Sequence, residues 1–162
     1  MPTTASPARL RPLTDDDAPA VLHLNHLHVE LLSPLDGPRL ERLVAWADHA
    51  DVIEVDGEVG GFVLTFAPGS DYDSDNYRWF AQRYDDFTYL DRVVVDSRFR
   101  RRGIAAAVYE ELEAGAGARM LLEVNVDPPN EPSLAFHRGR GYVEVGRGGE
   151  PGHVVALMAK EL

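Results

Sequence analysis

The stretch from Tyr89 to Leu112 limits, more than any other, the fold that this chain can adopt. It contains three consecutive valines at 93–95, a β-branched run that predicts a strand. After a turn, Ile104, Val108 and Leu112 follow one another at intervals of four residues, which predicts one face of an α-helix. We therefore expect a strand, a turn and a helix in direct succession.

The turn itself is basic and ends in a glycine. Four of the 16 lysine and arginine residues lie between Arg98 and Arg102, in a chain whose net charge is −11. Gly103 follows, and the free N–H groups and positive dipole end of a helix start favour an anion. The sequence has neither the GxxxxGK(S/T) phosphate loop nor a GxGxxG loop after a strand. Two interpretations remain open here: an anion-binding loop, and a basic turn that only caps the helix.

Length and composition indicate one globular domain over residues 1–162. No apolar window of about eighteen residues occurs, and the first residues resemble a loose tail rather than a signal peptide. We therefore expect no membrane association and a cytoplasmic location. The chain has no cysteine, which excludes disulfides, thiolate zinc sites and a cysteine nucleophile but fits either redox compartment.

The acidity of the chain argues against general binding of nucleic acid, which needs a basic face. It is compatible with a cationic amine substrate, but it is also a common feature of soluble proteins. His23 and His26 have the spacing of helical metal ligands, yet no acidic partner is fixed near them. We expect no metal site.

Local patterns predict the remaining elements. Thr14 and three aspartates predict the start of a helix, which we expect to bury Val29 and to end before Ser33. The aromatic and acidic segment 68–87 predicts a partly helical excursion over residues 76–84. We expect strands at 9–13, 51–55, 58–67, 91–95, 119–126, 142–145 and 153–159, and further helices near Pro38, after Gly103 and over 133–137. This order predicts a mixed α/β or α+β sheet.

Two motifs resemble those of one protein family. Arg100-x-x-Gly103-x-Ala105 resembles the acyl-CoA pyrophosphate loop, Gln/Arg-x-x-Gly-x-Gly/Ala, of the GNAT superfamily of N-acyltransferases. Further along the chain, a second motif resembles the family's Asn-x-x-Ala-x-x-(apolar)-Tyr-x-x-x-Gly-Phe segment; it reads Asn130-x-x-Ser133-x-x-Phe136-His137-x-x-x-Gly141-Tyr142. The resemblance covers residues 57–162 best, and residues 124–146 also resemble a largely uncharacterised bacterial subgroup.

The resemblance implies a fold and a cofactor. The fold is α/β (α+β), with a mixed, mostly antiparallel sheet that has a central, splayed pair of parallel strands and is flanked by helices. The cofactor is acetyl-CoA, with its pantetheine arm between the strands at 91–95 and 121–126 and its pyrophosphate on the helix that follows. The implied cofactor-binding residues are Val93, Val94, Val95, Arg100, Arg101, Arg102, Gly103, Ile104, Ala105, Asn130, Ser133 and Phe136.

Acyl transfer to an amine needs a base for the amine and a hydrogen-bond donor for the thioester oxygen. By the resemblance, Asp91 is the expected catalytic base, because it lies nine residues before Arg100. The same carboxylate is equally suited to a salt bridge with Arg92. Glu123, on the facing strand, is a second candidate base.

The departing thiolate also needs an acid. His137 stands where many family members carry a tyrosine with this role, and imidazole donates protons near neutral pH. We therefore expect His137 to be the catalytic acid. The alternatives are Tyr142, a tyrosine of segment 72–84, or solvent.

The amine acceptor is expected to contact the N-terminal helices and segment 72–84. Carboxylates and ring faces hold amines, so Tyr72, Trp79, Tyr84 and Glu123 are candidate substrate-binding residues, although the segment is equally suited to covering the sheet. The expected function is an N-acetyltransferase that moves the acetyl group of acetyl-CoA directly to a primary amine of a small molecule or peptide. The alternative is a non-catalytic acyl-CoA-binding sensor. Family members often dimerise, so a homodimer is a further expectation.

Overall fold

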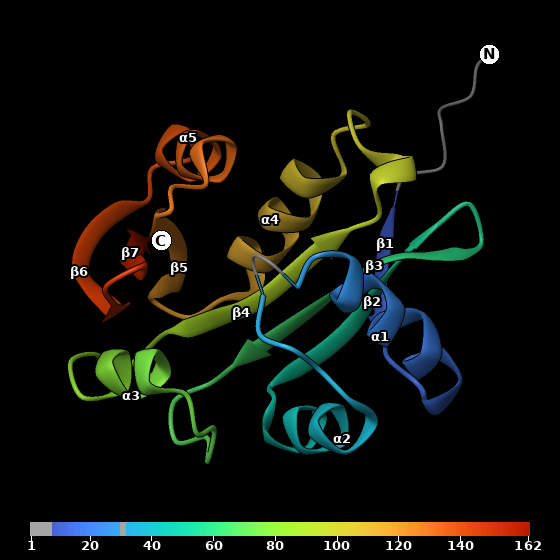
Figure 1. Ribbon diagram of the computed structural model, residues 1–162, viewed down its shortest axis with the longest axis horizontal. Coiled ribbons are helices and arrows are strands. Elements are labelled where there is room, and N and C mark those ends of the chain that lie inside the picture. The colour runs from blue at the N-terminus through green and yellow to red at the C-terminus, as the bar shows by residue number, and fades with distance from the viewer. Residues whose placement is uncertain (1–7, 30–31) are drawn as a thin grey trace.

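The structure is a computed structural model that describes residues 8–29 and 32–162 (Figure 1). Within these residues seven strands form one sheet in the order β1-β2-β3-β4-β5-β7-β6. The strands are β1 (Arg9–Pro12), β2 (His49–Val55), β3 (Glu58–Phe66), β4 (Thr88–Val95), β5 (Arg119–Asp127), β6 (Val143–Glu150) and β7 (His153–Glu161). Neighbouring strands are antiparallel except β4 and β5, which are parallel. The predicted fold class is confirmed.

Helices cover both faces of this sheet. They are α1 (Ala18–Leu27), α2 (Gly37–Trp46), α3 (Asp75–Ala81), α4 (Ile104–Gly115) and α5 (Glu131–Gly139), with short 3-10 turns η1 (Asp15–Asp17) and η2 (Ser97–Phe99). One hydrophobic core joins the sheet to α1, α2 and α3, and a second joins it to α4 and α5 (Figure 1). Successive strand residues alternate between the cores, as Leu121 and Leu122 do, because strand side chains point to opposite faces in turn.

The parallel pair β4–β5 is joined at one end and open at the other. Thr88 pairs with Met120 and Tyr89 with Leu121, and beyond these pairs the strands diverge. On its other side β4 stays paired with β3 as far as Val95. The β4 edge from Leu90 to Val95 therefore has no strand partner on the β5 side within the described chain.

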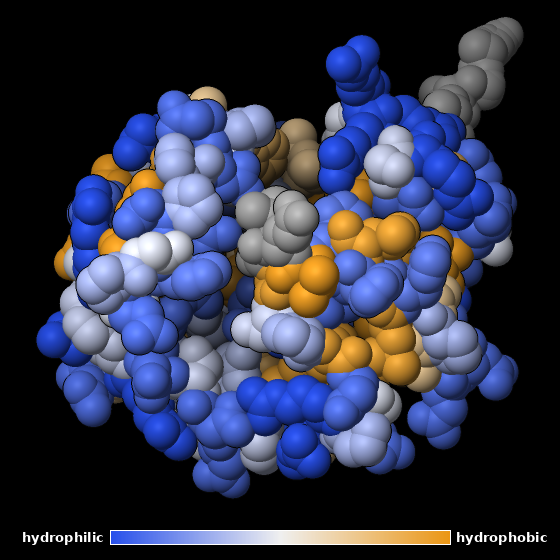
Figure 2. Space-filling model, in the orientation of Figure 1, coloured by the Kyte–Doolittle hydropathy of each residue, from blue (hydrophilic) through white to orange (hydrophobic). Residues whose placement is uncertain are grey.

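The first helix differs from the prediction. It ends at Leu27, and the side-chain Nδ1 of His28 donates a hydrogen bond to the carbonyl oxygen of Leu24, 2.9 Å away. The expectation that Val29 is buried was wrong, because it lies beyond this end and is 39% exposed. Figure 2 shows hydrophobic surface over α1 and α2 on a mostly hydrophilic face. Residues 30–31 of the expected helix and the expected N-terminal tail lie outside the described residues.

The predicted excursion between β3 and β4 is helical. Ser74 caps α3 by accepting a hydrogen bond from the backbone N–H of Tyr77, and Phe80 is fully buried. Trp79 packs on β6, where a Cβ at Gly146 would overlap the indole ring. Across the described ranges, no helix combines the length and hydropathy needed to cross a membrane.

Candidate active site

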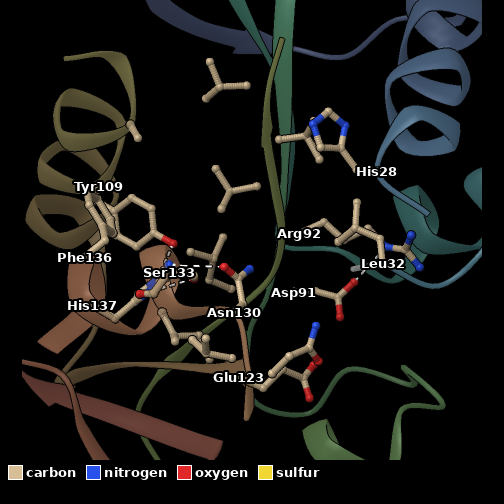
Figure 3. A pocket seen from close by; sticks show the side chains of 18 of the residues that line it. His28, Leu32, Asp91, Arg92, Tyr109, Glu123, Asn130, Ser133, Phe136 and His137 are labelled. Carbon is tan, nitrogen blue, oxygen red and sulfur yellow. Dashed lines mark hydrogen bonds and ion pairs between the residues drawn. The ribbon is translucent and has the colours of Figure 1, made fainter. Parts of the chain in front are cut away.

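A cavity of about 970 Å³ lies where β4 and β5 diverge (Figure 3). Its walls include Leu90–Val95 of β4, Leu122–Asn125 of β5, the start of α4, one side of α5 and the segment that follows α1. The volume is in the range of small-molecule sites. Because residues of both hydrophobic cores line it, the cavity passes through the sheet rather than lying on one face.

One end of the cavity is the N-terminus of α4. Gly103 is the N-cap, with φ +72°, and apart from its chain neighbours no side chain or backbone of the described protein crowds the position of a Cβ there. The first N–H groups of a helix lack intrahelical partners and attract anions. This end of the cavity is therefore open to a negatively charged group.

The arginines of the basic turn fall into two pairs. Arg100 and Arg101 line the cavity, and Arg101 has no ion pair in the described part of the chain. Arg102 points away and pairs with Asp56, with 3.2 Å between Nη2 and Oδ2. Arg98 likewise pairs with Asp96. Arg102, which the resemblance assigns to the cofactor site, does not line the cavity, and the β2–β3 hairpin supplies its partner.

The other predicted cofactor-binding residues are brought together around the cavity. They are Val93, Val94, Val95, Arg100, Arg101, Gly103, Ile104, Ala105, Asn130, Ser133 and Phe136. Asn130 also caps α5, since its side-chain oxygen accepts a hydrogen bond from the N–H of Ser133. The second motif therefore starts the helix that forms one wall.

Asp91 points into the cavity but both its oxygens have partners. The hydroxyl of Tyr72 donates to Oδ1 at 2.9 Å, and Nε of Arg92 donates to Oδ2 at 3.2 Å. Burial raises the pKa of Asp91, although Arg92 and Tyr72 oppose that shift. Arg92 also donates to the side-chain oxygen of Asn25 and the carbonyl oxygen of Ser33, each at 2.8 Å. The salt bridge that the sequence offered as the second interpretation of Asp91 is present.

Glu123, across the cavity from β4, is in a different environment. It accepts hydrogen bonds from the Tyr89 hydroxyl at 2.6 Å and from the side-chain amide of Asn76. No arginine or lysine of the described chain pairs with it. Burial, with the negative charge of Asp91 adding to it, raises the pKa of Glu123 to about 7. Glu123 therefore exchanges protons near neutral pH.

The neighbours of His137 favour the neutral ring with its proton on Nδ1. It is 6% exposed, and its Nδ1–H donates to the carbonyl oxygen of Ser133 at 2.7 Å. Nε2 therefore carries a lone pair, which accepts a hydrogen bond from the Tyr109 hydroxyl at 2.7 Å. Burial lowers the pKa of His137, so the neutral ring is favoured and it presents no free N–H to the cavity.

Tyr109 is a cavity residue that the sequence reasoning missed. It is 3% exposed, belongs to the core of α4 and lines the cavity with its neighbour His137. One signal was available: Tyr109 lies four residues after Ala105 of the first motif, so both lie on the same side of α4. By contrast, Tyr142 donates its hydroxyl to Glu113 and does not line the cavity.

Two of the four predicted substrate-binding residues lie elsewhere. Tyr72 and Glu123 line the cavity, but Trp79 and Tyr84 do not. Trp79 packs against β6, and the guanidinium of Arg119 lies 4.9 Å from the centre of the Tyr84 ring. Both rings pack against the sheet, as in the alternative that the segment covers it. No cluster of three metal-ligating side chains occurs within residues 8–29 and 32–162.

Comparison with known proteins agrees with this architecture. The Acetyltransferase (GNAT) family matches residues 16–142. The chain is similar to the solved structure of Ard1 from Thermoplasma volcanium, at 17% identity and a TM-score of 0.74, covering 97% of this chain and 99% of that one. It is also similar to an acetyltransferase from Thermus thermophilus, at 18% identity and a TM-score of 0.73, covering 99% and 100%.

A third similar structure is the ribosomal-protein-alanine N-acetyltransferase from Brucella melitensis, at 20% identity and a TM-score of 0.67, covering 95% of this chain and 99% of that one. A search of curated proteins finds no match. At these identities the solved structures establish the shared fold. The family match extends from before α1 to the end of the second motif. The chain therefore belongs to the acetyltransferase (GNAT) family.

Proposed function

We propose that the protein is an N-acetyltransferase that transfers the acetyl group of acetyl-CoA to a primary amine. The observation that carries the proposal is the cavity at the β4–β5 divergence, which joins an anion-binding helix N-terminus to a carboxyl group with a pKa of about 7. The first feature suits a pyrophosphate. The second suits the removal of a proton from an amine.

The residues present fit acetyl-CoA. The unpartnered edge of β4 offers main-chain groups to an extended amide-containing arm, as a neighbouring strand would. The space at Gly103, with Arg100 and Arg101 beside it, suits a pyrophosphate. Phe136 and the valines of β4 supply apolar contact. When bound, acetyl-CoA supplies the acetyl group as a thioester.

Glu123 is the better of the two candidate bases. A base works best when its pKa lies near the working pH, and the pKa of Glu123 is about 7. Asp91 is already engaged by Arg92 and Tyr72. Its negative charge contributes to the raised pKa of Glu123, so Asp91 supports the base electrostatically. We expect kcat/KM to rise with pH to a plateau above about 7, and Glu123→Gln to lower it roughly 100-fold.

The amine is expected to enter on the face covered by α1, α2 and α3. There Tyr72, Asn76 and the segment after α1 line the cavity beside both carboxyl groups. The name of the Brucella melitensis structure specifies a protein acceptor, which supports including peptide amines among the candidates. The acceptor class is therefore a small-molecule or peptide primary amine, to which the acetyl group passes directly from acetyl-CoA.

Thermal unfolding with acetyl-CoA, followed by a coenzyme A release assay with small amines and peptides, tests the proposal. A ligand that binds only the native state raises the melting temperature. A rise together with release supports the proposal. A rise without release across the panel favours the second candidate, a non-catalytic acyl-CoA-binding domain, which the histidine at position 137 independently supports. No rise at saturating acetyl-CoA contradicts both candidates.

A further inference from the structure

We propose that Tyr109 is a catalytic residue whose hydroxyl gives a proton to the sulfur of coenzyme A as it departs, and that His137 and Ser133 return a proton to Tyr109. The inference rests on the proposed function, because it assigns a second proton transfer to the same cavity. Its basis is the hydrogen-bonded series of Ser133, His137 and Tyr109 in the cavity wall.

The placement of Tyr109 suits a leaving group. Tyr109 and His137 belong to the α4–α5 side of the sheet, and Figure 3 shows the phenol oxygen pointing from α4 towards His137 and the interior of the cavity. Asp91 lies on the far side of the cavity in the same view, and Glu123 bonds residues of the α1–α3 side. The group that takes the amine proton and the group that gives the sulfur its proton therefore lie on different sides of the cavity.

The three residues can carry hydrogen bonds in two directions, and the second gives up the bond from Nδ1 to the Ser133 carbonyl oxygen. In the first arrangement, Nδ1–H of His137 donates to the Ser133 carbonyl oxygen and the Tyr109 hydroxyl donates to Nε2. In the second, the Ser133 hydroxyl donates to Nδ1, 3.2 Å away, and Nε2–H donates to the Tyr109 oxygen. The Tyr109 hydrogen is then free to point into the cavity.

The proton balance follows from the second arrangement. The amine nitrogen forms a C–N bond to the acetyl carbon. As the C–S bond breaks, its electron pair stays on sulfur; the O–H bond of Tyr109 breaks and an S–H bond forms. The Tyr109 oxygen takes the proton of His137 Nε2, and His137 Nδ1 takes the proton of the Ser133 hydroxyl. Ser133 recovers a proton from water. The proton lost by the amine goes to Glu123 and from there to solvent, so no charge accumulates in the wall.

The alternative acids are less well placed. His137 lines the cavity, but its Nε2 is occupied by the Tyr109 hydroxyl, so this nitrogen acts on the cavity through the phenol. Tyr142 is bonded to Glu113 outside the cavity, and Tyr72 donates to Asp91 beside the base. Burial raises the pKa of Tyr109 well above its usual range, which keeps the phenol protonated through the working pH range. In this proposal His137 supports Tyr109 and is not itself the acid that protonates sulfur.

Binding of coenzyme A and of desulfo-coenzyme A, which lacks the sulfur, tests the contact without any turnover. The measurement is titration calorimetry above the pKa of an alkyl thiol, about 8.5 for cysteine. A hydrogen bond from Tyr109 to the thiolate predicts that Tyr109→Phe weakens coenzyme A binding roughly tenfold and leaves desulfo-coenzyme A binding unchanged. Tyr142→Phe removes another buried phenol hydroxyl from the same core and should change neither affinity.

Three outcomes overturn the assignment or its premise. If Tyr109→Phe weakens both ligands equally, or neither, the hydroxyl does not contact sulfur and the inference is wrong. If the wild-type protein binds neither ligand, the proposed function fails instead. The two failures are therefore distinguishable.

The second test measures turnover of any amine from the panel that proves to be a substrate, first without the Tyr109 hydroxyl and then with a tyrosine at position 137. Tyr109→Phe should lower kcat roughly 100-fold while the KM for acetyl-CoA changes little. Adding His137→Tyr to Tyr109→Phe supplies a phenol from α5 into the space left by the hydroxyl, and should recover most of the rate. If the double variant is folded and binds coenzyme A but stays as slow as Tyr109→Phe, the proton-donor role is refuted.

Discussion

The Glu123→Gln substitution measures directly how strongly the fold disfavours a charge at this position. Glutamine keeps the size of the side chain and the bond from the Tyr89 hydroxyl, and the Asn76 amide can turn to offer its oxygen. Burial, and then Asp91, raise the pKa of Glu123 from 4.5 to about 7. Since one pKa unit corresponds to about 1.4 kcal/mol, the ionised form is destabilised in the folded protein by roughly 3 kcal/mol.

The size of this destabilisation depends on pH. Below pH 4.5 the carboxyl group is protonated in both the folded and the unfolded chain, so it costs nothing. Between 4.5 and about 7 the folded protein keeps a proton that the unfolded chain has lost, so stability falls as pH rises. Above about 7 the whole effect is present. Glu123→Gln should therefore be more stable than wild type by up to about 3 kcal/mol well above pH 7, and by nothing near pH 4.5.

Urea unfolding of both proteins across this pH range is the assay. Glu113→Gln is the matched control, because the pKa of Glu113 is lowered in the folded protein whereas that of Glu123 is raised. Burial of Glu113 is outweighed by hydrogen bonds from Arg140, Lys160 and Tyr142, which lower its pKa below 4.5. Glu113→Gln should therefore lose stability at neutral pH, and the loss should disappear in acid. A Glu123→Gln difference that is independent of pH, or that becomes a loss as pH rises, would refute the reasoning.

Three further variants test the anion-binding end and the buried ion pair. Replacing both Arg100 and Arg101 with alanine should weaken acetyl-CoA binding by at least about tenfold in calorimetry, because each removes a charge-assisted bond to phosphate. Arg102 is already paired with Asp56, so Arg102→Ala should leave the Kd for acetyl-CoA within about twofold. An equal loss of affinity in both variants would contradict the division of the arginines into two pairs. Arg92→Met should lower the free energy of unfolding by about 3–5 kcal/mol in urea, since Asp91 stays buried without its cation. A loss below about 1 kcal/mol would show that Asp91 is neutral in the folded protein.

Most of the fold was accessible from the sequence because its signals are local. The valine run, the Asp56-Gly57 turn and the four-residue spacing after Gly103 each act within a few positions, and the strands and helices occur where these signals lie. Val29 was wrongly expected to be buried because the apolar spacing continues beyond Leu27, where the helix ends and His28 caps it. The apolar spacing predicts which side of a helix is buried, but it does not predict the side-chain hydrogen bond that ends the helix.

The site was less accessible because its chemistry depends on distant residues. The pKa of Glu123 depends on burial and on its bonds to Tyr89 and Asn76, which lie 34 and 47 positions away in the chain. Tyr109 gains its significance from His137, which α5 brings to it across 28 positions. Arg102 matched the motif, yet Asp56 of a remote hairpin pairs with it. Sequence spacing indicated the residues near the cavity, and only the packing distinguished those that enter it.

The short pairing between β4 and β5 divides the sheet mechanically. Strands β1 to β4 form one block and β5 to β7 another, and the seam between them holds at Thr88–Met120 and Tyr89–Leu121. A ligand that pairs with the free edge of β4 while touching β5 extends this seam along its open length. Such a ligand would hold the two blocks together. The amides of Leu90–Val95 should therefore exchange hydrogen more slowly in the ligand-bound protein than in the ligand-free protein.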